Sequence, residues 1–347
     1  YIKLSFVIFG FIITNPRFSI GNLSVSKFSG LNDILDNKKV TNFMNFISSD
    51  CNEFRKLDNK LNGDLDPVYT KTRFNPLWIK PVIKLAENDY LAPSITAYII
   101  STFKGLFWWF DTHFRKEGRI KADAFRSFFG ALFEEYVGDV IKDIYTRAKI
   151  SPGIKFGTKK KSRVFFDWIV ETDNKIFLFE AKAYQFPLEV LQKGDPDKVG
   201  KQITDKLIKT IIQMYERTLD IKTFEELKLF RNKKLIPIAV FYEIPLVSTP
   251  LYQEKITSAL TDLDIKMPGI KDFKYYLMGI EELENYFYVS SAEDLDIILE
   301  KTSQNPHFGF NNEVSEIYKK SPSGGKKLLD KSFNKYCSDT LKIAGDK

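Results

Sequence analysis

Two strand-like runs around a short polar turn, within residues 164–182, constrain the fold of this chain more than any other stretch. The first run carries Asp167, and the second ends in Glu180-Ala-Lys182. The turn between them, residues 171–174, reads Glu-Thr-Asp-Asn. Runs rich in β-branched and aromatic residues on both sides of a polar turn are typical of a β-hairpin. We therefore expect a β-hairpin over these residues.

The parity of this hairpin decides where its polar side chains lie. Side chains alternate between the two faces of a strand, so Glu180 and Lys182 share one face. A four-residue loop places Asp167 opposite Leu178, on that same face, and a two-residue loop places Asp167 directly opposite Glu180. Both registers bring the three polar groups together, and only a loop of odd length would separate them.

Two carboxylates and an ammonium group on an apolar sheet face need compensation. Buried charges are costly, and two neighbouring carboxylates repel each other unless a cation lies between them. Mg²⁺ suits such a site because it binds through one or two carboxylates and keeps several waters. The alternative is an exposed hairpin face with an ordinary Glu-Lys pair. The agreement of residue types, spacing and flanking strands favours the metal site.

Composition narrows the classes of function. With 347 residues, 44% of them hydrophobic, the chain is long enough for two domains or for one with a large extension. A net charge of +7 suggests a polyanionic partner. Two cysteines, Cys51 and Cys337, and two histidines, His113 and His307, are too few for a set of zinc fingers. Without a disulfide framework, the cytoplasm is the default compartment.

The region before residue 119 is expected to be mainly helical and to form a domain of its own. Residues 5–14 are apolar but shorter than the roughly 20 residues of a membrane span, so we expect no membrane partner. A signal-peptide core is one interpretation of them, and a buried strand or packing segment is the one we favour. Helices are expected in these ranges: 31–35, 40–57, 78–91 and 95–113.

Residues 103–114 are apolar around most of a helix circumference, which is typical of a core or an interface between domains. They motivate a regulatory or partner-binding role for residues 1–118, including formation of a homo-oligomer. The break at Lys116-Glu-Gly118 is the predicted boundary of this region.

Residues 119–301 show the element order of an α/β domain. A long amphipathic helix is expected over 122–145, and either Glu134 or Glu135 within it is placed to face the hairpin. A loop beginning at Ser151-Pro-Gly153 follows. Further elements are expected as helices over 198–217, 254–263 and 281–286, and as strands over 235–242 and 275–280. This order predicts a mixed sheet flanked by helices.

Two further segments bear on ligand binding. Four cations, Lys159, Lys160, Lys161 and Arg163, lead into the strand of Asp167; they suit either a phosphodiester backbone or a solvated loop. Residues 192–197 are expected to overhang the site. Residues 302–347 are expected to form a tail of short helices joined by a flexible link.

This order of elements resembles the PD-(D/E)XK nuclease superfamily, whose fold is restriction-endonuclease-like. Gly130-Ala-Leu-Phe-Glu134 is similar to the motif of its first helix, Asp167 to its first strand acid, and Glu180-Ala-Lys182 to its Glu-x-Lys motif. Gln202 is similar in placement to a polar residue at the start of the next helix. The resemblance covers residues 121–299, and Phe166 stands where many members have proline.

The resemblance implies a Mg²⁺-dependent deoxyribonuclease, with Mn²⁺ as a substitute and RNA as a further substrate to test. It makes Asp167 and Glu180 metal ligands, Glu134 an outer ligand, Lys182 the group that orients or deprotonates water, and Gln202 a supporting residue. Family habit alone suggests an endonuclease that acts in antiviral defence. The alternative is a catalytically inactive nuclease-like module that binds nucleic acid or serves in an assembly.

Overall fold

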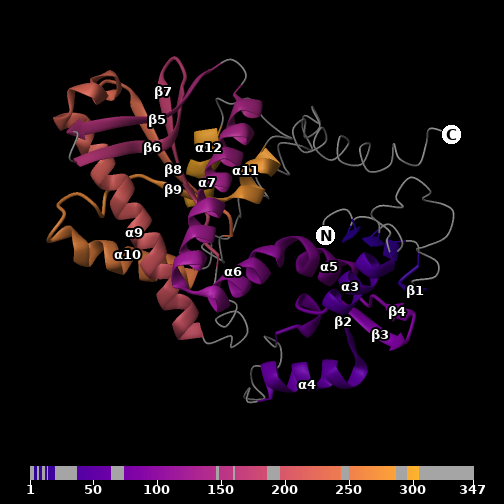
Figure 1. Cartoon of the computed structure of the whole chain (residues 1–347). Coiled ribbons are helices and arrows are strands. Elements are labelled where there is room, and N and C mark those ends of the chain that lie inside the picture. Colours follow the sequence, from indigo (N-terminus) through magenta and orange to yellow (C-terminus); the bar gives the residue numbers. More distant parts are fainter. Residues whose placement is uncertain are drawn as a thin grey trace, which may run out of the picture. The chain divides into compact units, whose positions relative to one another are not determined.

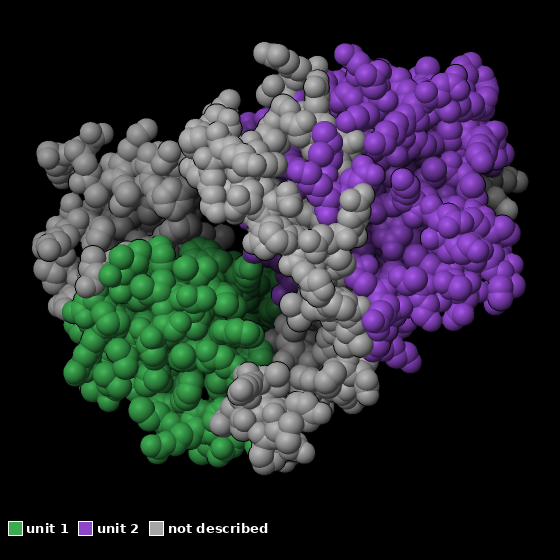
Figure 2. Space-filling view, turned by 180° about the vertical axis from the view of Figure 1, so that it is seen from behind, with its two compact units in different colours: residues 1–126, 187–195, 331–347 green, residues 127–186, 196–330 purple. Residues whose placement is uncertain are grey.

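The protein is a mixed α/β chain that forms two compact units (Figure 2). The computed structural model describes residues 4–5, 8–9, 12–13, 15–19, 37–63, 74–145, 148–158, 161–185, 196–243, 250–286 and 295–304. Residues 1–126 belong to the first unit, and residues 127–186 and 196–330 belong to the second. The division falls within one helix, whereas the predicted boundary at Gly118 coincides with the start of that helix.

The first unit is built on a four-stranded mixed sheet. Its strand order is β1-β4-β3-β2, and only the β2–β3 pair is parallel. The strands are β1 (Arg17–Ser19), β2 (Ser48–Asp50), β3 (Val82–Ala86) and β4 (Asp89–Leu91). The helices are α3 (Asn37–Ile47), α4 (Cys51–Asn62), α5 (Ile95–Ile99) and α6 (Leu106–Glu117), with a π turn over Ile100–Lys104, and α7 (Arg119–Ile144) follows.

The described part of this region is mainly helical, as predicted, but the sheet within it was not predicted. The helix expected over 78–91 is wrong, because that stretch forms the β3–β4 hairpin after a short 3-10 turn, Pro76–Trp78. Pro81 has no N–H to donate within a helix, and Val82 and Ile83 are β-branched residues that favour strands.

The helix expected over 40–57 is confirmed at both ends, as α3 and α4, but strand β2 divides it into two helices. Asp50, the last residue of β2, accepts hydrogen bonds from the backbone N–H groups of Asn52 and Glu53, both at 2.8 Å. An aspartate that caps a helix in this way starts a new helix rather than continuing the previous one.

The apolar stretch at residues 5–14 packs into the core of the first unit, as expected, but its described residues are helical rather than extended. Leu4, Ile8 and Ile12 are buried at helical spacing and lie in one cluster with residues of α3 and with Tyr98. The Tyr98 hydroxyl donates to the Ser5 carbonyl at 3.0 Å. Among the described residues, no helix is long and apolar enough to cross a membrane.

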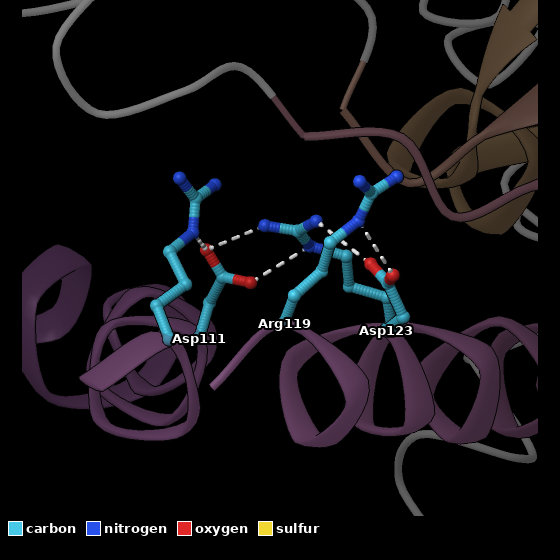
Figure 3. Close-up of polar contacts among 5 residues, drawn as sticks. Asp111, Arg119 and Asp123 are labelled. Atoms are coloured by element: carbon cyan, nitrogen blue, oxygen red, sulfur yellow. Dashed lines mark hydrogen bonds and ion pairs between the residues drawn. The ribbon is translucent and has the colours of Figure 1, made fainter. Parts of the chain in front are cut away.

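A network of ion pairs joins α6 to the first turns of α7 (Figure 3). Asp111 on α6 is buried, and its carboxylate accepts from Arg115 Nε at 2.7 Å and from Arg126 Nε at 2.8 Å. Arg126 also reaches Asp123 at 3.4 Å, and Arg119 pairs with Asp123 at 3.5 Å. One buried carboxylate therefore holds arginines from both helices.

The second unit contains a five-stranded mixed sheet in the order β5-β6-β7-β8-β9. The first three strands are antiparallel, and the last three are parallel to one another. The strands are β5 (Lys149–Thr158), β6 (Lys161–Glu171), β7 (Lys175–Lys182), β8 (Lys234–Phe241) and β9 (Tyr276–Gly279). The helices are α9 (Pro196–Thr223), α10 (Pro250–Asp264), α11 (Ile280–Tyr286) and α12 (Leu295–Gln304), with a 3-10 turn over Glu225–Phe230.

The predicted helices and strands of this unit are confirmed, but strand β5 and helix α12 were not predicted. The loop expected to begin at Ser151-Pro-Gly153 lies instead inside strand β5. Ser, Pro and Gly are typical loop residues, and they are tolerated here because β5 is an edge strand of the sheet.

The central hairpin adopts the two-residue register. Trp168 pairs with Phe179, and Glu171 pairs with Ile176. Continued by one residue, this register would place Asp167 opposite Glu180. Because side chains alternate, Phe179 faces one side of the sheet and Glu180 the other.

Helices cover both faces of the sheet (Figure 1). On one face, Phe177 and Phe179 of β7 lie in a buried cluster with Val137 and Ile141 of α7 and with residues of α11 and α12. Helix α9 covers the other face and buries Leu207, Ile211 and Met214. The apolar stripe of α7 is narrower than predicted, because Phe128 and Leu132 remain 65% and 50% exposed.

The indole of Trp168 fixes α7 against β6. Its Nε1 donates to the Glu134 carbonyl at 2.8 Å. A Cβ atom on Gly138, one helical turn further along α7, would lie inside the contact distance of the Trp168 ring. Glycine is thus required at 138 for the close approach of helix and strand.

We expect Gly138→Ala to destabilise the second unit by about 2–3 kcal/mol, because the new methyl group displaces Trp168 from α7. Gly130→Ala on the same helix is the control. Its Cβ meets no atom within 4 Å, so the better helix propensity of alanine should stabilise the protein by up to about 1 kcal/mol. Urea unfolding compares the two variants, and equal free energies of unfolding would refute this account of Gly138.

In the first unit, Asp111→Ala should cost about 1–2 kcal/mol of unfolding free energy, because it removes a buried carboxylate that serves two arginines. Asp123→Ala in the same network is the matched control. Its side chain is 55% exposed, so its loss should cost less than about 0.5 kcal/mol. Thermal unfolding of the two variants in low and high salt checks the contrast.

Candidate active site

A β-bulge in strand β6 positions Asp167. The β5–β6 register shifts between Pro152 and Ile154, so that Gly153 alone faces two residues, Phe166 and Asp167. Phe166 has a φ of 49°, in the left-handed region that residues other than glycine rarely adopt. A bulge bends the strand and redirects its side chains, and strained residues of this kind concentrate at functional sites.

The Asp167 carboxylate lies against the end of β7. Its Oδ2 accepts a hydrogen bond from the Ala181 N–H at 2.8 Å. Burial, followed by the charge of Glu180, raises the pKa of Asp167 to about 7, while the Ala181 N–H opposes that rise. Asp167 therefore changes charge close to neutral pH, unlike an ordinary aspartate.

Glu180 is a buried carboxylate with donors on both of its oxygens. Only 1% of the residue is exposed. Its Oε1 accepts from Lys182 Nζ at 2.6 Å and from Gln213 Nε2 at 3.0 Å, and its Oε2 accepts from Arg217 Nη1. Lys182 also donates to Gln213 Oε1 at 3.0 Å, so Lys182, Gln213 and Glu180 form a closed ring of contacts.

Glu134 shares the electrostatic environment of these groups. Glu134 is an exposed residue, but the protein atoms around its carboxyl group desolvate it in part and so raise its pKa. The charge of Glu180 raises that pKa further. Lys182 and Arg217 oppose it. The contact between Trp168 and the Glu134 carbonyl holds this turn of α7 beside β6. The carboxyl group of Glu134 therefore interacts electrostatically with those of Asp167 and Glu180.

The structure therefore brings together four of the predicted residues, Glu134, Asp167, Glu180 and Lys182. The fifth, Gln202, lies in helix α9, but its side chain is outside the described residues. The predicted overhang at 192–197 falls almost entirely outside them as well.

The predicted cationic loop is described only in part. Lys159, Lys160 and the side chain of Lys161 lie outside the described residues. Arg163 pairs with Asp220 of α9 at 3.0 Å and lies over the Phe156 ring at 5.2 Å. Its side chain is half exposed, so a phosphate could still contact it.

Sequence reasoning missed two residues of the site, Gln213 and Arg217. They stand four residues apart on α9 and therefore on one face of that helix, between the buried residues Ile211 and Met214 and the exposed surface. A polar pair at helical spacing beside a buried stripe was the available signal.

The donor types of the site suit a hard divalent cation. The Asp167 carboxylate lies beside the end of β7 and interacts with the charge of Glu180, and Mg²⁺ needs only one or two carboxylates beside its waters. Among the described residues, no group of three acidic, histidine or cysteine side chains forms a cage that could hold a metal. The residues thus fit a water-rich, two-carboxylate site and do not fit a closed protein cage.

Comparisons with family models, with curated proteins and with solved structures find no match to this chain.

The raised pKa of Asp167 predicts a stability that depends on pH. The carboxyl group has an ordinary value of 3.8 when unfolded and about 7 when folded, so the folded state binds more protons between these values. Stability should then fall as the pH rises from about 4 to about 7. Asp167→Asn should make the free energy of unfolding less dependent on pH over this range. At pH 8 in EDTA it should raise that free energy by about 2 kcal/mol.

The control for this prediction is Asp173→Asn in the exposed hairpin turn, which should keep the pH profile of the wild type. Urea unfolding between pH 4 and pH 8 measures all three proteins. A pH profile that Asp167→Asn leaves unchanged would contradict the assignment.

Proposed function

We propose that the second unit is a metal-dependent nuclease of the PD-(D/E)XK type that hydrolyses phosphodiester bonds of DNA. The observation that carries the proposal is the convergence of Asp167, Glu180 and Lys182 where β6 bulges and β7 ends. The element order also supports it: a long helix, three antiparallel strands, a helix and a parallel strand are the elements expected of a restriction-endonuclease-like fold.

Asp167 and Glu180 would hold the divalent cation, Mg²⁺ or Mn²⁺, with Glu134 as an outer ligand through water. Such an ion, when bound, polarises the scissile phosphate and lowers the pKa of a coordinated water. Lys182 would orient that water or take up its proton, and Gln213 fixes the Lys182 ammonium by accepting a hydrogen bond from it.

The described site contains the carboxylates of Glu134, Asp167 and Glu180 and two cations, Lys182 and Arg217. When all five groups are ionised, the net charge of the site is therefore negative. A divalent cation would reverse this balance, so that a phosphodiester could approach. Lys159 and Lys160, which precede β6 in the sequence, and Lys161 and Arg163 within β6 would then contact the backbone of the nucleic acid. An endonuclease in antiviral defence is the role that the family resemblance favours.

One observation favours a second function, an inactive nuclease-like module that binds nucleic acid or serves in an assembly. Both Glu180 oxygens already have cationic partners, so the buried charge is compensated by protein groups alone. A module of this kind would bind DNA with a strong salt dependence but leave it intact.

Cleavage assays distinguish these two functions. Plasmid DNA, linear DNA and RNA would be incubated with Mg²⁺, Mn²⁺ or EDTA. We expect nicking of DNA that needs the metal and that falls by roughly 10²-fold or more in Asp167→Ala and in Lys182→Ala.

Glu134→Gln and Glu135→Gln form a matched pair within the same assays, because the two residues are neighbours on α7. Only the first should slow cleavage. Metal-dependent nicking that survives both Asp167→Ala and Lys182→Ala would refute the site, and DNA binding without any cleavage would establish the inactive module.

A further inference from the structure

We propose that Arg217 is a built-in competitor for the cation site: it shares Glu180 Oε2 with an incoming divalent cation and transfers to Asp220 when the cation binds. The inference rests on the proposed function for the existence of a cation site, and it adds how the chain sets the affinity of that site. It concerns two residues of α9 to which the mechanism above assigns no role.

The contacts of Glu180 define the competition. Oε1 already accepts from two donors, Lys182 and Gln213, which use both of its lone pairs. Oε2 accepts from Arg217 alone among the donors that the described residues supply. A cation that approaches Glu180 must therefore bind at Oε2, and it meets the guanidinium there. Two positive charges cannot share one buried oxygen at close range without strong repulsion.

Asp220 offers Arg217 a second acceptor. It lies three residues further along α9, on the same face, and its side chain is only 13% exposed. Its Oδ1 accepts from Arg163 at 3.0 Å, whereas Oδ2 is buried and has no hydrogen-bond partner among the described residues. A buried acceptor without a partner is unfavourable, so a guanidinium that reached Oδ2 would be stabilised there.

The position of Arg217 suits such a transfer. Its charge already acts on Asp220: burial raises the pKa of Asp220, and Arg163 and Arg217 oppose that rise. The guanidinium also lies over the Phe166 ring at 5.9 Å, next to Asp167 in the bulge. A long flexible side chain between two acidic partners can exchange them by rotamer changes alone.

Single substitutions cannot separate this exchange from simple electrostatics. Arg217→Met removes a positive charge near Glu180, and this would favour a cation under either account. Asp220→Asn removes a negative charge, and this would disfavour a cation under either account. The discriminating quantity is the coupling between the two changes, because Asp220 matters to the exchange only when Arg217 is present.

The experiment is a double-mutant cycle on Mn²⁺ affinity in the full chain, measured by electron paramagnetic resonance of free Mn²⁺ and by calorimetry at pH 8. The four proteins are the wild type, Arg217→Met, Asp220→Asn and the double variant. We expect Arg217→Met to tighten Mn²⁺ binding roughly tenfold. Asp220→Asn should weaken it about threefold or more in the wild type and clearly less in the Arg217→Met background, where only the electrostatic part of the effect is left.

Two controls complete the cycle. Arg163→Gln removes the other partner of Asp220 and should not weaken Mn²⁺ binding. Arg217→Lys keeps the charge and the competition and guards against a variant that fails to fold; its affinity should stay closer to the wild type than that of Arg217→Met. Circular dichroism confirms that each protein is folded.

An equal effect of Asp220→Asn in both backgrounds would overturn the exchange, as would an unchanged affinity in Arg217→Met. These outcomes are separable from failure of the proposed function. Coupling without cleavage of any substrate would refute the nuclease and keep the exchange, and cleavage without coupling would do the reverse. No Mn²⁺ binding by any of the proteins would refute both.

Discussion

The burial of Glu180 is the interaction on which the second unit depends most. A carboxylate that is 1% exposed at the end of a buried strand would be prohibitive by itself. It is tolerated because Lys182 from the same strand and Gln213 and Arg217 from α9 satisfy its oxygens. The same contacts tie α9 to β7, so one polar group both orients a covering helix and defines the site. Its position on the face opposite Phe179 follows from strand alternation.

Packing on the opposite face of the sheet, between Trp168 of β6 and helix α7, fixes the position of the site residues. Trp168 lies against α7 at Gly138 and holds the Glu134 carbonyl, so the strand that carries Asp167 and the helix that carries Glu134 cannot shift independently. The bulge at Phe166 then turns Asp167 toward the end of β7. A helix, a bulged strand and a strand end are thus fixed relative to one another by ordinary packing, which is what a precise arrangement of charged groups requires.

Much of this arrangement was predictable from the sequence, because it depends on local patterns. The alternation around residues 171–174 predicted the hairpin, and either even register brought Asp167, Glu180 and Lys182 to one face. The register itself depends on the turn, and a polar tetrad does not distinguish a two-residue loop from a four-residue loop. The apolar periodicity of α7 and α9 predicted both helices, since long periodic segments give the strongest signal.

The errors have physical reasons as well. Residues 78–91 contain a short hairpin whose strands are too brief to show alternation, and a four-stranded sheet was missed as a result. The strand β5 was missed because its loop-like Ser151-Pro-Gly153 is acceptable only on an edge strand beside a bulge, a condition set by tertiary structure. Gln213 and Arg217 were missed because a polar pair on a helix acquires meaning only when the buried carboxylate that it meets is known.

The same compensation of charge underlies both of the proposed functions. A buried carboxylate can be neutralised by protein cations, and the result is then an inert ion pair. It can also be neutralised by a divalent cation, which can catalyse a reaction. Here Arg217 is the protein cation that neutralises Glu180. Asp167, with a pKa of about 7, is the second carboxylate that a divalent cation would need. On the proposed function, ionisation of Asp167 would favour a cation over the guanidinium, because Asp167 then repels Glu180 and a divalent ion would relieve that repulsion more than one arginine can. On the proposed function, the balance between Arg217 and a cation at Glu180 would decide whether the second unit only binds nucleic acid or also cleaves it.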